Sequence, residues 1–206
     1  MSIQKGNQNM KFSTRFVSAT REYSTFEKQI PSPYFRKSFT PGKVSSAEVT
    51  ICGLGFYELF INGQRITRGL LSSYIANPDD ILYYDNYDLT PYLTEGENVI
   101  GVQLGNGMID CFGGQVWEFE KARFRSAPKF ALTFEAASEN GTKTEFDAAD
   151  GFVCTESPVY LDDLRVGEFY DARREIPGWN RPGFDASAWR ETIPAETPRG
   201  ECRICD

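Results

Sequence analysis

The sequence predicts an all-β protein, a β-sandwich of the jelly-roll type preceded by an irregular N-terminal arm. Short segments rich in aromatic and β-branched residues recur along the chain, and clusters of Gly, Pro, Asn and Asp separate them. Aromatic residues make up 14% of the chain, which suits large rings packed on pleated, half-buried surfaces. No stretch sustains the 3.6-residue periodicity of a helix, so two packed sheets are the expected architecture.

The predicted arm comprises residues 1–33, which are polar and irregular. Residues 21–30 have the composition for one or two helical turns, but Pro31 and Pro33 stop any helix there because proline lacks the amide donor and restricts the residue before it. We expect the arm to pack along the sandwich, which is predicted to span residues 34–198.

The first predicted strands are residues 34–39, 47–52 and 56–61. In the second of these, Val49 and Ile51 alternate with polar residues, as in a strand with one buried face. Asn62-Gly63 follows the third strand. Because both central residues of a type I′ turn need positive φ, this dipeptide between apolar segments indicates a β-hairpin.

Further strands are predicted at residues 81–89, 98–104, 129–135, 142–146, 151–155 and 166–170. Two of these strands, 129–135 and 142–146, flank a loop that ends in Asn140-Gly141, and we expect them to form a second hairpin. Residues 177–198 are rich in Pro, Gly and Trp, and we expect them to wrap the surface without regular structure. Residues 199–206 are interpreted as the start of a linker to downstream domains.

Charge and cysteine content exclude several classes of protein. The formal net charge is −7, and the densest basic stretch, Lys121 to Arg125, is short, so neither a nucleic acid nor an anionic membrane surface is an expected partner. No apolar run reaches the length of a membrane span, and Met1 to Met10 lacks the apolar core of a signal peptide. Five scattered cysteines do not resemble a disulfide framework, which favours a reducing, cytoplasmic location.

The chain lacks the residues of common catalytic sites. It contains no histidine, which removes Ser-His and Cys-His nucleophile pairs and mixed zinc sites. The Cys202–Cys205 C-x-x-C follows a proline-rich stretch, not a strand that leads into a helix, and is interpreted as chance spacing. Gly105-Asn106-Gly107 is interpreted as a tight turn because no third glycine or Gly-Lys-Ser/Thr follows it. Carboxylate pairs are plentiful, but nothing marks a desolvated acid of the kind glycosidases use.

Several motifs resemble the N-terminal domain of bacterial α-L-rhamnosidases, and the resemblance covers about residues 34–198. The motifs, in chain order, are Gly53-Leu54-Gly55-Phe56-Tyr57, Ile61-Asn62-Gly63, Tyr87-Asp88-Leu89-Thr90, Gly96-Glu97-Asn98-Val99-Ile100-Gly101, Leu104-Gly105-Asn106-Gly107, Gly167-Glu168-Phe169-Tyr170-Asp171-Ala172-Arg173 and the run from Gly178-Trp179 through Gly183-Phe184-Asp185 to Trp189. The early motifs are shared loosely with other galactose-binding-like sandwiches, and the closing ones are more specific.

This resemblance implies a non-catalytic piece of a longer enzyme. In that family, catalytic carboxylates lie in a downstream six-hairpin helical barrel and hydrolyse terminal α-L-rhamnose with inversion, and nothing in this chain matches the barrel. No cofactor is required, although some related modules bind L-rhamnose through loops that also hold calcium. The chain departs from the family at Leu71 to Asp80 and at Met108-Ile109. Both departures fall in predicted loops at one end of the sandwich, where a sugar would sit.

The expected ligand-binding residues supply hydrogen-bonding groups and an aromatic face for a sugar: Asn106, Asp110, Gln115, Trp117, Tyr57, Glu58 and Asn62. Each has a structural alternative; Asn62 is a good turn former, and Tyr57 suits the core. Two readings of the function stay open. The module recognises L-rhamnose or a rhamnosyl glycoside and positions the substrate, or it is a purely structural module that docks the catalytic barrel and binds no sugar. A free-standing binding protein is a more remote third.

Overall fold

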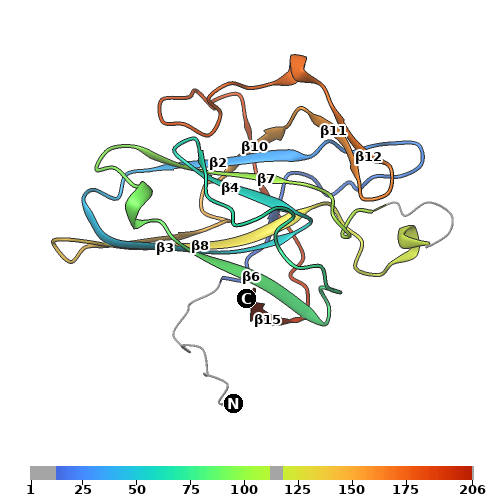
Figure 1. The fold of residues 1–206 in the computed structure, drawn as a ribbon, viewed down its shortest axis with the longest axis horizontal. Helices are drawn as coiled ribbons and strands as arrows, with labels where there is room; N and C mark the ends of the chain where they lie inside the picture. Colours follow the sequence, from blue (N-terminus) through green and yellow to red (C-terminus); the bar gives the residue numbers. More distant parts are fainter. Residues whose placement is uncertain (1–12, 112–117, 206) are drawn as a thin grey trace.

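The computed structural model describes residues 13–111 and 118–205, and its fold is the predicted all-β sandwich (Figure 1). The strands are β1 (Val17–Ser18), β2 (Pro33–Phe39), β3 (Val44–Leu54), β4 (Tyr57–Ile61), β5 (Gln64–Arg65), β6 (Ile81–Asp88), β7 (Asn98–Leu104), β8 (Lys129–Ser138), β9 (Lys143–Asp147), β10 (Val153–Glu156), β11 (Val159–Asp163), β12 (Gly167–Tyr170), β13 (Arg190–Glu191), β14 (Ile193–Pro194) and β15 (Glu201–Ile204). Three short 3-10 helices, η1 (Thr90–Tyr92), η2 (Phe119–Lys121) and η3 (Ala172–Arg174), lie between them.

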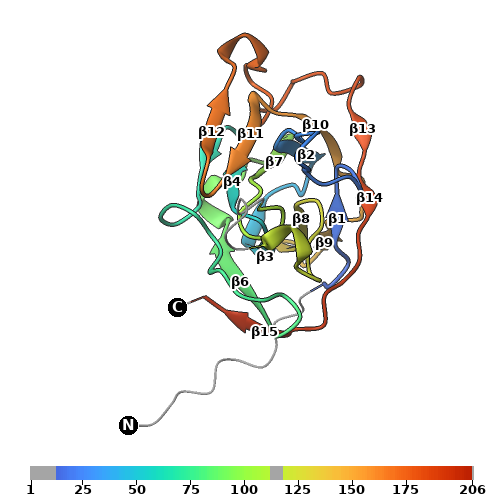
Figure 2. The ribbon, with the colours of Figure 1, turned by 90° about the vertical axis from the view of Figure 1, so that its right-hand side faces the viewer.

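Two sheets form the layers of the sandwich. One has the order β14-β1-β8-β3-β6-β15, with β9 also paired to β8, and the other has the order β13-β10-β2-β7-β4-β5. The pairings are antiparallel except that of β15 with β6, which is parallel. Strands β11 and β12 form a separate two-stranded sheet beside the second layer (Figures 1 and 2). Among the described residues, no helix is long and apolar enough to cross a membrane.

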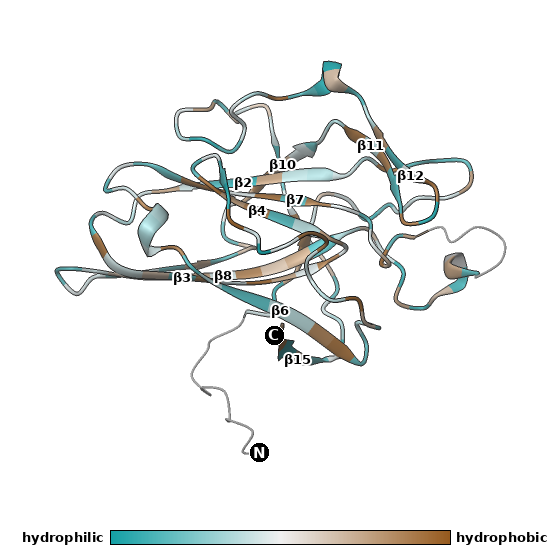
Figure 3. Cartoon of the chain, viewed as in Figure 1, coloured by the Kyte–Doolittle hydropathy of each residue, from teal (hydrophilic) through white to brown (hydrophobic). Residues whose placement is uncertain are grey.

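The core lies between the layers and is dominated by aromatic rings. Phe35 of β2 and Phe130 of β8 are fully buried, and their ring centroids lie 4.9 Å apart in an edge-to-face arrangement. Phe134 stacks on Phe146 at 4.7 Å. Burying one such side chain contributes about 1.5–3 kcal/mol, so this cluster accounts for much of the drive to form two layers. Figure 3 shows the corresponding hydrophobic stretches along the strands of both layers.

Both predicted hairpins are confirmed. Asn62 and Gly63 have φ of 52° and 84°, as the turn requires, and they join β4 to β5 through the pair Ile61–Gln64. β8 and β9 pair from Thr133–Asp147 to Ala137–Lys143 around the Asn140-Gly141 loop.

The sandwich extends beyond the predicted bounds of residues 34–198. In the arm, Val17 of β1 is buried and pairs with both Phe130 and Pro194. At the other end, β15 adds a strand to the edge of β6, although residues 199–206 were expected to begin a linker. These short strands carry little alternation of their own, and they form because β8 and β6 offer open edges whose backbone groups need partners.

The C-terminal tail is held by rings as well as by short strands. Trp179 is buried and stacks on Tyr34 of β2, with ring centroids 4.1 Å apart and planes 12° apart. Trp189 stacks on Trp179 at 6.4 Å. The tail also includes two short strands, β13 and β14, where no regular structure was expected.

Candidate functional site

Two of the predicted sugar ligands, Asn106 and Asp110, are buried and serve the fold. The Asn106 side-chain amide donates to the Asp162 carbonyl at 2.7 Å, and its backbone amide donates to the Asp162 carboxylate at 2.6 Å. Both carboxylate oxygens of Asp110 accept from the Ser24 amide, at 3.0 and 2.9 Å. The Arg125 guanidinium forms an ion pair with the same carboxylate at 3.4 Å. Burial raises the pKa of Asp110 to about 6, against the opposing effect of these donors. Asn106 thus joins its loop to β11, and Asp110 anchors the arm.

Tyr57 is also a core residue, with 2% of its surface exposed. Its hydroxyl bonds the Asp85 carboxylate at 2.5 Å and the Tyr87 hydroxyl at 2.9 Å. Burial raises the pKa of Tyr57, and the neighbouring Tyr87 and Asp85 raise it further. The side chain is therefore out of reach of a sugar at the surface.

The remaining predicted residues do not converge with these. Asn62 lies at the far end of β4, where its side chain donates to the Tyr92 carbonyl and accepts from the Val99 amide. That is the start of β7, whereas Asn106 follows the end of β7, so the strand separates the two residues. Glu58 is partly exposed and pairs with Arg65 at 2.9 Å. Gln115 and Trp117 lie outside the described residues.

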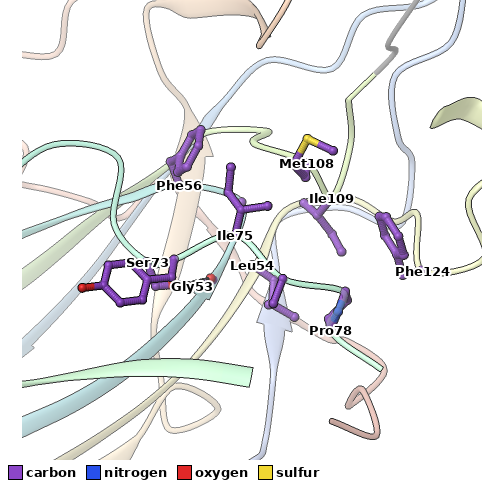
Figure 4. Close-up of a pocket in the computed structure, with 12 residues that line it drawn as sticks. Gly53, Leu54, Phe56, Ser73, Ile75, Pro78, Met108, Ile109 and Phe124 are labelled. Atoms are coloured by element: carbon purple, nitrogen blue, oxygen red, sulfur yellow. Dashed lines mark hydrogen bonds between the residues drawn. The ribbon is translucent and has the colours of Figure 1, made fainter. Parts of the chain in front are cut away.

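The hollow that fits the predicted location of a sugar site lies at the loop end of the sandwich (Figure 4). Three segments meet there: the β3–β4 turn, the 73–78 loop that precedes β6, and the loop after β7 with Phe124 opposite it. The lining residues are Gly53, Leu54, Gly55, Phe56, Ser73, Tyr74, Ile75, Ala76, Pro78, Met108, Ile109 and Phe124. We call this the loop-end pocket. Both segments that the sequence analysis expected to differ from the rhamnosidase pattern, 71–80 and 108–109, contribute residues to its lining.

Buried backbone contacts fix the walls of the loop-end pocket. The Tyr57 amide donates to the Ser72 carbonyl at 2.7 Å, and the Ser73 hydroxyl donates to the Gly53 carbonyl at 3.2 Å. Across the pocket, the Gly105 amide donates to the Phe56 carbonyl at 2.7 Å. The β3–β4 turn is therefore bonded to both neighbouring loops, and these bonds set the positions of the pocket walls.

Glycine permits the close approach of these loops. Gly55 has φ of +104°, and a Cβ placed on it would lie 2.1 Å from the Gly105 carbonyl oxygen. No side chain can be accommodated there without moving one of the two backbones. Gly55 and Gly105 thus lie against each other in the fold. The sequence did not show this contact because the two glycines are far apart along the chain.

The loop-end pocket is small, and apolar side chains and polar groups such as the Ser73 hydroxyl both line it. Its cavity volume is about 30 Å³, which is room for one water molecule or one methyl-sized group. In Figure 4, the side chains of Ile75, Met108 and Ile109 are grouped around it. Tyr74 and Ile75 also line it, yet they are 55% and 57% exposed. The pocket can seat a small apolar substituent while the exposed Tyr74 ring contacts the rest of a ligand.

A larger open hollow of about 690 Å³ lies on the outer face of the first sheet, but its chemistry differs. Asp88, Glu48, Glu135 and Glu145 stand directly opposite one another in a row across β6, β3, β8 and β9. Like charges in register repel one another. No aromatic ring is among the described residues that line this hollow, so it offers no stacking platform for a sugar.

The family resemblance implies calcium for some modules, and the described residues hold no acidic cluster for it. Within residues 13–111 and 118–205, no group of three or more His, Cys, Asp or Glu is placed to hold a metal ion. The Asp110 carboxylate, the candidate in this loop, already faces Arg125 and the Ser24 amide. We derive no role for a metal.

Comparisons with known proteins agree on one family. Residues 42–205 match the model of the α-L-rhamnosidase N-terminal domain. An α-L-rhamnosidase of Formosa agariphila is 33% identical over 190 residues, which are 84% of this chain and 20% of that protein. The structure of the α-L-rhamnosidase from Dictyoglumus thermophilum superposes with a TM-score of 0.79 at 32% identity, over 92% of this chain and 22% of that one.

A further solved relative is the Streptomyces avermitilis α-L-rhamnosidase, crystallised in complex with L-rhamnose. It superposes with a TM-score of 0.73 at 28% identity, over 83% of this chain and 17% of that one. The chain spans about a fifth of the length of the relatives it matches.

Proposed function

The chain belongs to the α-L-rhamnosidase N-terminal domain family, and on that premise we propose that it is a non-catalytic module that recognises a terminal α-L-rhamnosyl group at the loop-end pocket. The module serves a longer polypeptide that hydrolyses such groups, and it contributes binding, not catalysis. The observation that carries the proposal is the methyl-sized cavity, with Leu54, Met108 and Ile109 in its wall, to which the exposed Tyr74 also contributes.

The chemistry of the sugar matches this cavity. L-Rhamnose is 6-deoxy-L-mannose, so its ring carries a methyl group where most hexoses carry a hydroxymethyl group. A cavity of about 30 Å³ lined by Leu54, Met108 and Ile109 can take that methyl group. The additional hydroxyl of L-mannose would have to fit a space of methyl size, and if it displaced the sugar from the apolar wall or stayed unpaired the cost would be about 1–3 kcal/mol. The Tyr74 ring would then lie against the C–H face of the sugar.

The test is a titration of the isotope-labelled chain with L-rhamnose, and with L-mannose as the matched control, followed by amide shifts in NMR spectra with and without calcium. We expect saturable shifts in the segments 73–78 and 108–109 with L-rhamnose. Binding of L-mannose should be weaker by about 5-fold to 150-fold, which is the hydroxyl cost converted to an equilibrium ratio.

Variants locate the site. Tyr74→Ala should abolish the shifts, whereas Tyr160→Ala, which removes another exposed tyrosine on the β11–β12 sheet, should leave them unchanged. Equal affinity for both sugars would rule out binding of the rhamnose methyl group in the cavity. No shifts up to high concentrations of either sugar would rule out recognition and leave a purely structural module.

A further inference from the structure

The β11–β12 hairpin presents an apolar surface that the sandwich does not cover. Five large side chains on it and on its turn are 40–65% exposed: Tyr160, Leu164, Val166, Phe169 and Tyr170. The Tyr160 and Phe169 rings lie side by side, with centroids 6.0 Å apart. We call this set the hairpin surface. In Figures 1 and 2 the hairpin lies outside the two layers, at one edge of the molecule.

The exposure of the hairpin surface is not the result of a loosely attached hairpin. The Val159 side chain is buried, and the Val159 carbonyl accepts from the Ser32 amide at 2.9 Å. Asp162 accepts from both the backbone and the side chain of Asn106. In the hairpin turn, the Asp163 carboxylate accepts from the Arg165 and Val166 amides. The hairpin is therefore held in place by its inner side while its outer side faces solvent.

We propose that the hairpin surface is the docking site for a neighbouring domain of a longer α-L-rhamnosidase polypeptide, whose facing surface is apolar. The neighbouring Tyr160 and Phe169 rings are exposed apolar surface of the kind that often marks an interaction site on a soluble protein, and two-stranded sheets are only marginally stable without further packing. The relatives of the chain are about five times its length, so they have the additional polypeptide that such a domain needs.

The size of the surface selects a tethered partner over a second copy of the chain. The five side chains expose roughly 500 Å² together, since large side chains bury 150–250 Å² each when fully covered. A stable complex of free partners buries about 800 Å² on each side, whereas interdomain contacts within one chain are smaller and benefit from high effective concentration. The net charge of −7 also opposes self-association. The inference rests on family membership and not on the sugar pocket.

The test compares hydroxyl-radical labelling of aromatic residues in the 206-residue chain and in the longest product of its gene. We expect Tyr160, Phe169 and Tyr170 to be labelled readily in the short chain and about tenfold less in the long one. Tyr23, which is 44% exposed and belongs to the N-terminal arm, should be labelled equally in both. Equal labelling of the hairpin in both proteins, or a gene that encodes no further domain, would overturn the proposal.

A variant of the hairpin surface distinguishes a docked domain from a second copy of the chain as its binding partner. In the longer protein, Phe169→Ser should restore labelling of Tyr160 and Tyr170 by loosening the contact, whereas Phe26→Ser, at another exposed phenylalanine, should not. If sedimentation instead shows that the short chain dimerises and that Phe169→Ser prevents it, the occupant is a second copy and the proposal is wrong. L-Rhamnose binding can fail in either protein without affecting these outcomes, so the two proposals are tested separately.

Discussion

The loop-end pocket and the hairpin surface both expose large apolar side chains, yet they are built differently. The pocket is concave, and its walls are loops bonded to one another through backbone groups such as Tyr57–Ser72 and Gly105–Phe56. The hairpin surface consists of exposed side chains on a two-stranded sheet and its turn, and the sheet is bonded to the sandwich through Asp162. Exposure alone therefore does not identify the kind of ligand. A fixed concave wall suits a small group, and an open sheet face suits another protein surface.

The largest expected difference between the two regions is in the free energy of unfolding when a glycine of each is replaced by alanine. Gly55 and Gly167 have nearly the same φ, +104° and +103°, but only Gly55 has a backbone oxygen where a Cβ would go. Gly167→Ala should therefore cost about 1–3 kcal/mol of backbone strain, and Gly55→Ala should cost more than about 4 kcal/mol because it also separates two loops. Urea unfolding of both variants measures the difference. Equal costs would show that the pocket walls can move apart easily.

The buried carboxylate behind the pocket gives a pH-dependent effect. Because burial raises the pKa of Asp110 from 3.8 to about 6, the folded chain keeps this proton at pH values where the unfolded chain has lost it. The associated stability is complete below pH 3.8 and is lost as the pH rises through about 6.

We therefore expect the unfolding free energy of the wild type, relative to that of Asp110→Asn, to fall by about 2 kcal/mol between pH 4 and pH 7. Urea unfolding of both proteins across this range measures it. The hairpin variant Phe169→Ser, which leaves Asp110 in place, should follow the wild-type pH dependence. A difference between wild type and Asp110→Asn that does not change with pH would contradict the raised pKa.

The smallest effect is expected at the hairpin surface itself. Phe169→Ser in the 206-residue chain should change the unfolding free energy by no more than about 0.5 kcal/mol, because the ring is half exposed and contacts little of the core. Phe130→Ala, at a fully buried ring of β8, should cost about 3–5 kcal/mol under the same conditions. A large loss for Phe169→Ser would mean that this ring supports the fold of the chain and is not reserved for a partner.

The sequence predicted the fold better than the site, for a reason visible in particular residues. Strands β4 and β7 and the Asn62-Gly63 turn were predicted because alternation and turn chemistry are local properties of a few adjacent residues. Strand β11 was missed because the acidic pair Asp162-Asp163 interrupts its apolar pattern. Asn106 and Asp110 were expected to face a sugar, but polar side chains in loops are also the usual partners of buried backbone groups.

The sequence by itself determined the fold class, most strand positions and the family, because hydrophobic periodicity, turn dipeptides and family motifs are all written in short segments. Only the tertiary structure decided which open edges β1 and β15 complete, which polar groups are used internally, and where loops enclose a cavity. Those features depend on residues far apart in the chain, such as Ser24 with Asp110, 86 residues away, or Gly55 against Gly105. Partners of this kind are set by how the two sheets pack, and no local pattern records them.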